Sequence, residues 1–230
     1  MTRSDSGTDA RRTDLLRWSA GLGAVTAEAL AVREATSLAS ARGRLASAER
    51  QRLLARWAPL AGRPALYTLT RAGLRAAGLH GIEPARVSAA NAEHSIICAS
   101  VAAALGRSHP AGRVIGEPEL RALQRRGSTV VPSAVLGRDR LGLPVAHRAD
   151  LALMPASSAG AQPILIEVEL SVKAPGRLLE ICRAWARCRG IAGVIYLVAP
   201  IVEAPLQRAI DGAQASAVVT AVPLAQLLAR

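Results

Sequence analysis

The chain has almost no lysine and no phenylalanine. Lys173 is the only lysine, beside 28 arginines. Five aromatic residues are present in 230 positions: Trp18, Trp57, Trp185, Tyr67 and Tyr196. The core must therefore be aliphatic, built largely from Ala, Leu and Val. Recognition of single-stranded nucleic acid by rows of stacking aromatic rings is disfavoured for the same reason.

Cysteine is scarce, and long apolar runs are missing. Cys98, Cys182 and Cys188 form no CxxC pair and have no histidine at zinc-ligand spacing, so they are expected to be small core residues in a reducing compartment. The first residues lack the apolar stretch of a signal peptide, and no window of about 18 unbroken apolar residues occurs. These absences predict a cytoplasmic protein with no membrane partner.

Acidic residues are outnumbered, and the net charge is +12. Residues 1–80 hold 13 arginines against 6 acids, a net charge of +7, whereas the longer remainder carries +5. Such an excess favours an acidic partner, and nucleic acid is the simplest one. The alternative is a generally basic surface that follows from a preference for arginine over lysine codons.

The first third of the sequence predicts a winged helix-turn-helix domain over residues 13–80, after a disordered tail over 1–12. Apolar spacing predicts helices from Thr13, after Thr26 and after Thr36. Two extended segments at 53–60 and 65–70 flank turn residues and predict a hairpin, and a short helix follows over 71–77.

In a domain of this kind the third helix enters the DNA major groove and the hairpin reaches the neighbouring backbone. The polar candidates for contact with double-stranded DNA are Arg33, Ser40, Arg42, Arg44 and, at the hairpin turn, Arg63. The alternative is a winged helix used for protein contact, with these arginines merely solvated. The sequence leaves open whether the protein forms a homodimer.

The second part, residues 88–230, alternates helices and strands and predicts an α/β domain. Helices are expected over 91–105, from 116, and over 177–189 and 206–213. Strands are expected over 148–154, 164–170, 194–198 and 218–222. Residues 80–84 are expected to link the two domains.

Acidic residues gather around two of these strands. Because side chains alternate along a strand, Glu167 and Glu169 point to one face, and Asp150 on the preceding strand can join them. Carboxylate oxygens suit Mg²⁺ or Mn²⁺, and Lys173 follows as a proton-exchanging cation. The alternative is a set of structural ion pairs with Arg148 or Arg177.

Two resemblances rest on these motifs. The second part resembles the PD-(D/E)XK nuclease superfamily, which pairs an Asp with Glu-x-Lys on the next strand. From about Thr13 to Ala199 the chain resembles the replication-relaxation family of bacterial and plasmid proteins, chiefly in Ala65–Gly73 and Ile166–Ser171. The resemblance implies a restriction-endonuclease-like domain with Asp150 and Glu167 as metal ligands. Glu169 stands where the nuclease lysine is usual, and Lys173 could replace that lysine only if the strand ends early and bends.

The expected protein is therefore α+β or α/β, with an N-terminal winged helix and a nuclease-like C-terminal domain. The leading hypothesis is a double-stranded DNA-binding protein of a mobile element or plasmid replication or transfer system. The alternatives are an active Mg²⁺-dependent endodeoxyribonuclease, with Asp150, Glu167, Glu169 and Lys173 as catalytic residues, and a non-catalytic transcriptional regulator.

Overall fold

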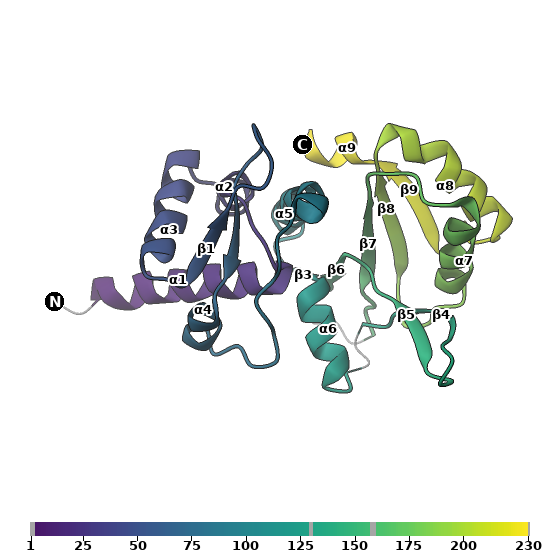
Figure 1. The fold of residues 1–230 in the computed structure, drawn as a ribbon, viewed down its shortest axis with the longest axis horizontal. Coiled ribbons are helices and arrows are strands. Elements are labelled where there is room, and N and C mark those ends of the chain that lie inside the picture. Colours follow the sequence, from purple (N-terminus) through teal and green to yellow (C-terminus); the bar gives the residue numbers. More distant parts are fainter. Residues whose placement is uncertain (1–2, 129–130, 157–159, 230) are drawn as a thin grey trace. The chain divides into compact units, whose positions relative to one another are not determined.

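The computed structural model describes residues 3–128, 131–156 and 160–229, which form a mixed α+β protein (Figure 1). The chain divides into two compact units. The first extends to Arg107 and includes Ile115–Ala122; the second comprises Ser108–Val114 and the residues from Leu123 onward. Among the described helices, none combines the length and the apolar character needed to cross a bilayer.

The first unit begins with three helices, a two-stranded antiparallel ribbon and a short helix, in the order expected from the sequence. These elements are α1 (Arg3–Leu22), α2 (Ala27–Glu34), α3 (Leu38–Arg50), β1 (Leu54–Trp57), β2 (Leu66–Leu69) and α4 (Arg71–Ala76). Thr26 and Ser37 cap α2 and α3 by accepting hydrogen bonds from Ala29 N and Ser40 N at 3.0 and 3.1 Å.

Helix α1 differs from the expected disordered tail over residues 1–12, because it starts at Arg3. Polar composition suggested fraying, yet polar side chains do not oppose a helix when they pair along its surface. Arg12 and Asp9, one turn apart, form such an ion pair at 3.0 Å.

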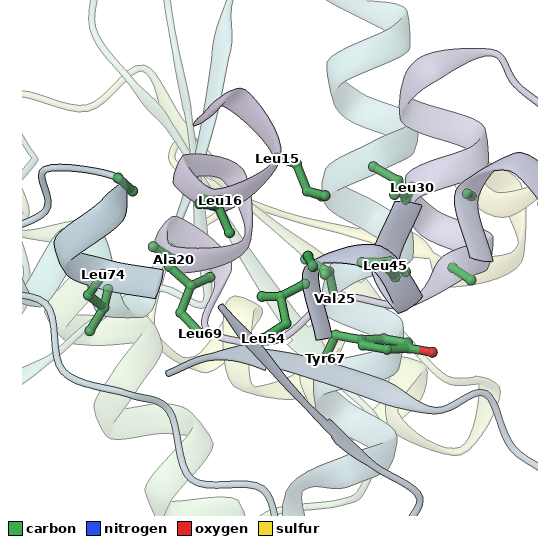
Figure 2. Close-up of a cluster of buried hydrophobic side chains, with 14 residues drawn as sticks. Leu15, Leu16, Ala20, Val25, Leu30, Leu45, Leu54, Tyr67, Leu69 and Leu74 are labelled. Carbon is green, nitrogen blue, oxygen red and sulfur yellow. The ribbon is translucent and has the colours of Figure 1, made fainter. Parts of the chain in front are cut away.

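An aliphatic cluster holds the first unit together (Figure 2). Its members come from every element of the three-helix and ribbon segment: Leu15, Leu16, Ala20, Val25, Ala27, Leu30, Ala41, Leu45, Ala48, Leu54, Tyr67, Leu69, Leu74 and Ala77. Leu30 and Leu45 are wholly buried, and Trp18 and Leu53 pack against the cluster as partly buried residues. The sequence predicts Trp18, Leu30, Leu45, Leu53 and Leu69 as the core of this domain. Leu30, Leu45 and Leu69 are members of the buried cluster, whereas Trp18 and Leu53 lie at its edge.

The Ala65–Gly73 motif has a packing explanation. The Thr70 hydroxyl caps α4 through Gly73 N at 3.0 Å and donates to the Arg52 carbonyl at 2.7 Å. A Cβ on Gly73 would meet the Leu53 carbonyl oxygen at 2.1 Å, which is inside van der Waals contact. Glycine is therefore required for α4 to approach the chain entering β1.

Helix α5 (Ala89–Ser108) belongs with the first unit up to Arg107, although the sequence placed it in the second domain. Its small residues allow close packing. Ala92 and Ile96 lie against Ala24 and Leu66, while Ala99 and Ala103 cluster with Ala29. The expected linker over residues 80–84 thus precedes a helix that completes the first unit's core.

The second unit is built on a five-stranded sheet of order β3-β6-β7-β8-β9 and a separate β4–β5 hairpin. The strands are β3 (Arg113–Gly116), β4 (Ala134–Arg138), β5 (Pro144–His147), β6 (Leu151–Met154), β7 (Ile164–Glu169), β8 (Gly193–Val198) and β9 (Val219–Pro223). Helices α7 (Pro175–Ala186), α8 (Pro200–Gly212) and α9 (Leu224–Leu228) follow β7, β8 and β9. Helix α6 (Glu117–Arg125) follows β3, and the end of β3 and α6 as far as Ala122 are counted with the first unit.

Strand direction changes within this sheet. Strand β7 pairs antiparallel with β6 and parallel with β8, which in turn is parallel with β9. Parallel neighbours need crossover helices, and the usual right-handed crossover places α7 and α8 on the same face of the sheet (Figure 1). That face carries the acidic side chains of β7.

Candidate functional site

Strand register brings three carboxyl-bearing residues to one face of the sheet. Leu151 lies opposite Ile166, so Asp150, one residue earlier, falls opposite Glu167. Glu169 is two residues farther along β7 and points to the same face. The Asp150 Oδ2 atom accepts a hydrogen bond from the Val168 amide at 2.7 Å, which fixes its carboxylate just before the start of β6.

Glu167 is a buried acid with a histidine partner. It is 5 % exposed, and its Oε1 lies 2.7 Å from His147 Nε2 at the end of β5. The His147 ring packs edge-on against Trp185 of α7, with ring centroids 5.7 Å apart and an interplanar angle of 66°. Packing and hydrogen bonding thus orient the imidazole toward the carboxylate.

Lys173 reaches the acidic residues because β7 ends at Glu169. The chain bends at Ser171, and the Lys173 Nζ atom then forms an ion pair with Glu169 Oε2. Pro175 starts α7 two residues later, where its fixed φ suits a first helical position. The bend that the sequence required for Lys173 to replace the usual nuclease lysine is present.

Burial sets the electrostatics of this group. Desolvation raises the pKa of Glu167, the His147 hydrogen bond opposes that rise, and the nearby Asp150 charge adds to it. Desolvation lowers the pKa of Lys173, while Glu167 and Asp150 raise it and Arg177 lowers it further. The charges of Asp150 and of the partner residue therefore act on the pKa of both Glu167 and Lys173.

Buried side chains of α7 and β8 form the wall behind Glu167. Tyr196 lies in register with Glu167 on β8. Burial and then the Glu167 charge raise the pKa of Cys182 to about 11 and raise that of Tyr196 well above its usual value. Both groups stay neutral at physiological pH, so the wall adds no charge beside the carboxylates.

The carboxylates fit a divalent cation only in part. In the described portion of the second unit, no three His, Cys, Asp or Glu side chains bring ligand atoms within 4.8 Å of one another. Mg²⁺ nevertheless needs only one or two carboxylates, since it keeps several waters and takes the rest of its ligands from substrate phosphates. Asp150 and Glu167 could supply these two, because the His147 contact engages one oxygen of Glu167.

The arginines expected to contact DNA are mostly engaged in ion pairs within the first unit. Arg33 forms a bidentate pair with Asp14, at 2.8 and 3.0 Å, and its guanidinium lies 5.0 Å from the centre of the Trp18 ring. Arg63 pairs with Glu93. These contacts give Arg33 and Arg63 structural partners on the protein itself.

The two candidate arginines of α3 lie in different environments. Arg44 pairs with Glu34 and donates to the Arg11 carbonyl at 3.1 Å, and desolvation lowers its pKa. Arg42 is well exposed and approaches Glu28 at 3.4 Å. Ser40 and Arg50 are also exposed on this helix, so Ser40, Arg42 and Arg50 offer a solvent-facing polar surface.

Two residues near these surfaces were missed from the sequence. His147 is not among the site residues predicted from the sequence, and its position three residues before Asp150 was the available signal. Arg50 lies at the C-terminal end of the exposed face of α3, which also includes positions 39, 42 and 43. Helical spacing of the sequence is enough to place these positions on one face.

Comparison of the chain with family models, curated proteins and solved structures gives no match. The case for function therefore depends on the geometry of the two units.

Proposed function

We propose that the protein binds double-stranded DNA and carries, in its second unit, a divalent-cation site of the PD-(D/E)XK type. The observation that carries this proposal is the arrangement of Asp150, Glu167 and Glu169 on one sheet face, with Lys173 folded back onto Glu169. Mg²⁺ or Mn²⁺, when bound, would activate water and neutralise a scissile phosphate.

DNA binding is supported by the first unit. We interpret α1–α3 and the β1–β2 ribbon as a winged helix, with α3 as the helix that enters the major groove. Residues 1–80 carry a net charge of +7, and Ser40, Arg42 and Arg50 are exposed on α3. Small neighbours, Ala39 and Gly43, leave room for close approach to a duplex.

The chain's own residues have separable roles at the acidic site. Asp150 and Glu167 would hold the cation, and His147 orients Glu167 through its Oε1 atom. Lys173 holds positive charge beside Glu169, and its lowered pKa brings a proton-exchanging ammonium nearer to the working pH. The order of the structural elements and the motifs Ala65–Gly73 and Ile166–Ser171 favour a role in plasmid or mobile-element replication, similar to that of the replication-relaxation family.

Thermal unfolding in the presence of Mg²⁺ or Mn²⁺ tests the cation site. A ligand that binds only the folded state at a hundred-fold excess over its Kd stabilises it by about 2.7 kcal/mol, so the melting temperature should rise. Asp150→Ala and Glu167→Gln should remove that rise. Glu203→Gln, which neutralises an exposed acid on α8, should keep it. A melting temperature that is unchanged by either metal would refute the cation site.

Endonuclease activity is the second candidate, favoured by the return of Lys173 to Glu169. Supercoiled plasmid incubated with the protein and Mg²⁺ or Mn²⁺ should then be nicked or linearised. Asp150→Ala should abolish cleavage, Lys173→Arg should slow it, and Glu203→Gln should leave it unchanged. Cation binding without any cleavage by the native protein would restrict the function to DNA binding.

A further inference from the structure

The β4–β5 hairpin carries four apolar side chains that are largely exposed. Of the described large hydrophobic residues, Leu141 is the most exposed, at 83 %, and Val135, Leu143 and Val145 are 50, 58 and 41 % exposed. The hairpin forms its own two-stranded sheet, separate from the five-stranded one (Figure 1). Four such residues within one hairpin make it a candidate interaction surface.

The tip that carries Leu141 is ordered by its own hydrogen bonds. Asp139 Oδ1 accepts from the amides of Leu141 and Leu143 at 2.8 and 2.9 Å. The Asp139 amide donates to the Leu143 carbonyl at 2.8 Å, and Arg138 donates to the Gly142 carbonyl at 2.5 Å. Leu141 is therefore held outward on a preorganised turn, which lowers the entropy lost on binding.

The charge at the tip favours DNA as the partner. Arg138 and Arg140 precede Leu141 on either side of Asp139, whose carboxylate is turned onto the amides of the tip. The tip thus has an excess of one positive charge. Two copies of this tip meeting across a two-fold axis would bring like charges together, because such an interface uses the same patch on both partners. A duplex instead offers phosphates to the arginines and an apolar base stack to the leucine.

The hairpin is joined directly to the acidic site. His147, the last residue of β5, lies against Glu167. Six extended residues separate His147 from Leu141, a reach of at most about 20 Å. Since one turn of B-DNA is about 34 Å long, a tip at that reach would touch a duplex within one turn of a phosphate held at Asp150 and Glu167.

We propose that the β4–β5 hairpin is a DNA-binding arm that places Leu141 as an apolar wedge between base pairs in the minor groove. Arg138 and Arg140 contact the flanking phosphates. Proteins that insert Leu, Ile, Met, Phe or Pro at a base step unstack it and bend the duplex. This inference rests on the proposed DNA-binding function, and it names a second contact, distinct from α3, together with its effect on the DNA.

Two readouts on one short duplex, labelled with a donor and an acceptor dye at its ends, test the arm. Anisotropy measures occupancy and energy transfer between the dyes measures bending. The full-length native protein should bind and increase the transfer. Leu141→Ala should bind within about 3-fold of native, because phosphate contacts dominate affinity, but should lose the change in transfer. Arg140→Ala should lower the log–log salt slope by about 0.9.

Ile201→Ala is the matched control, since Ile201 is 70 % exposed on α8 of the same unit. It should bind and bend the duplex as the native protein does. Both exposed residues should tolerate truncation without a change in melting temperature.

The possible failures are distinguishable. A native protein that does not bind the duplex would overturn the DNA-binding function and the arm together. Binding with equal bending by native protein and Leu141→Ala would overturn the arm alone. A native dimer that becomes monomeric with Leu141→Ala in sedimentation would assign the tip to self-association and also overturn the arm.

Discussion

Arg42 and Arg50 on one side of α3, and Arg44 on another, allow a direct test of the proposed contact between the first unit and DNA. Arg42 and Arg50 are exposed and lie two helical turns apart, about 12 Å along the axis. Arg44 is held by Glu34 and the Arg11 carbonyl. We expect Arg42 and Arg50 to neutralise phosphates and Arg44 to maintain the fold.

The expected magnitude follows from counterion release. Each phosphate contact contributes about 0.9 to the negative slope of log affinity against log salt, so a four-fold rise in salt weakens binding roughly 3-fold per contact. Arg42→Ala and Arg50→Ala together should reduce the slope by about 1.8. The weak, exposed Arg42–Glu28 contact at 3.4 Å should not prevent this exchange of partners.

Arg44→Ala should leave the slope almost unchanged and lower the free energy of unfolding by no more than about 1 kcal/mol, since its pair is partly exposed. Anisotropy titrations of a labelled duplex over a range of NaCl concentrations give the slopes, and urea unfolding gives the stability. Arg208→Ala, an exposed arginine of α8, serves as the control with a native slope. The assignment is refuted if Arg44→Ala flattens the slope as much as the Arg42 and Arg50 changes do.

Three further predictions concern stability. Leu45→Ala removes a wholly buried side chain and should lower the free energy of unfolding by about 2–5 kcal/mol in urea titrations, whereas a loss below about half a kcal/mol would place it outside the core. Gly73→Ala should destabilise by about 1–3 kcal/mol, because its Cβ would clash with the Leu53 carbonyl; an unchanged urea midpoint would contradict that contact. Burial raises the folded pKa of Glu167, so in metal-free buffer its unfolded form, with a pKa of about 4.3, ionises first. The contribution of Glu167 to the free energy of unfolding is then lost as pH rises from that value through the folded pKa. Urea unfolding of the native protein and of Glu167→Gln across acidic and neutral pH should show this loss in the native protein only. Parallel pH profiles of the two proteins would show that burial does not perturb the pKa of Glu167.

Much of the fold could be predicted because many elements carry their own pattern. Strands β6 to β9 and helix α7 fall within or close to the expected ranges, whereas α8 begins at Pro200, six residues before the expected start. The β4–β5 hairpin could not be predicted, since almost all residues from 135 to 146 are exposed and no alternation of burial marks the strands. Strand β3 is four residues long, and so short a strand exists only through its pairing in the sheet.

The grouping of the acidic residues at the candidate site could be predicted from the sequence, but their contacts, including that of His147 with Glu167, could not. Alternation along β7 was enough to place Glu167 and Glu169 on one face. Whether Lys173 could reach them depended on where β7 ends, and strand ends are set by the neighbouring strand and by the bend at Ser171. The ion pairs of Arg33, Arg44 and Arg63 join residues 10 to 30 positions apart, which helical spacing cannot reveal.

The metal-binding and structural interpretations of the acidic residues are compatible. Glu167 and Glu169 are each 5 % exposed, and burying both without partners would be strongly unfavourable. His147 and Lys173 each engage one oxygen of these carboxylates, so the second unit can fold before any cation binds. A metal should therefore add stability to a protein that is already folded, unlike a structural zinc, whose removal unfolds its domain. Cooperative unfolding that persists in a chelator, combined with a higher melting temperature in Mg²⁺ or Mn²⁺, is what this arrangement requires, and a chain that unfolds in the chelator would contradict it.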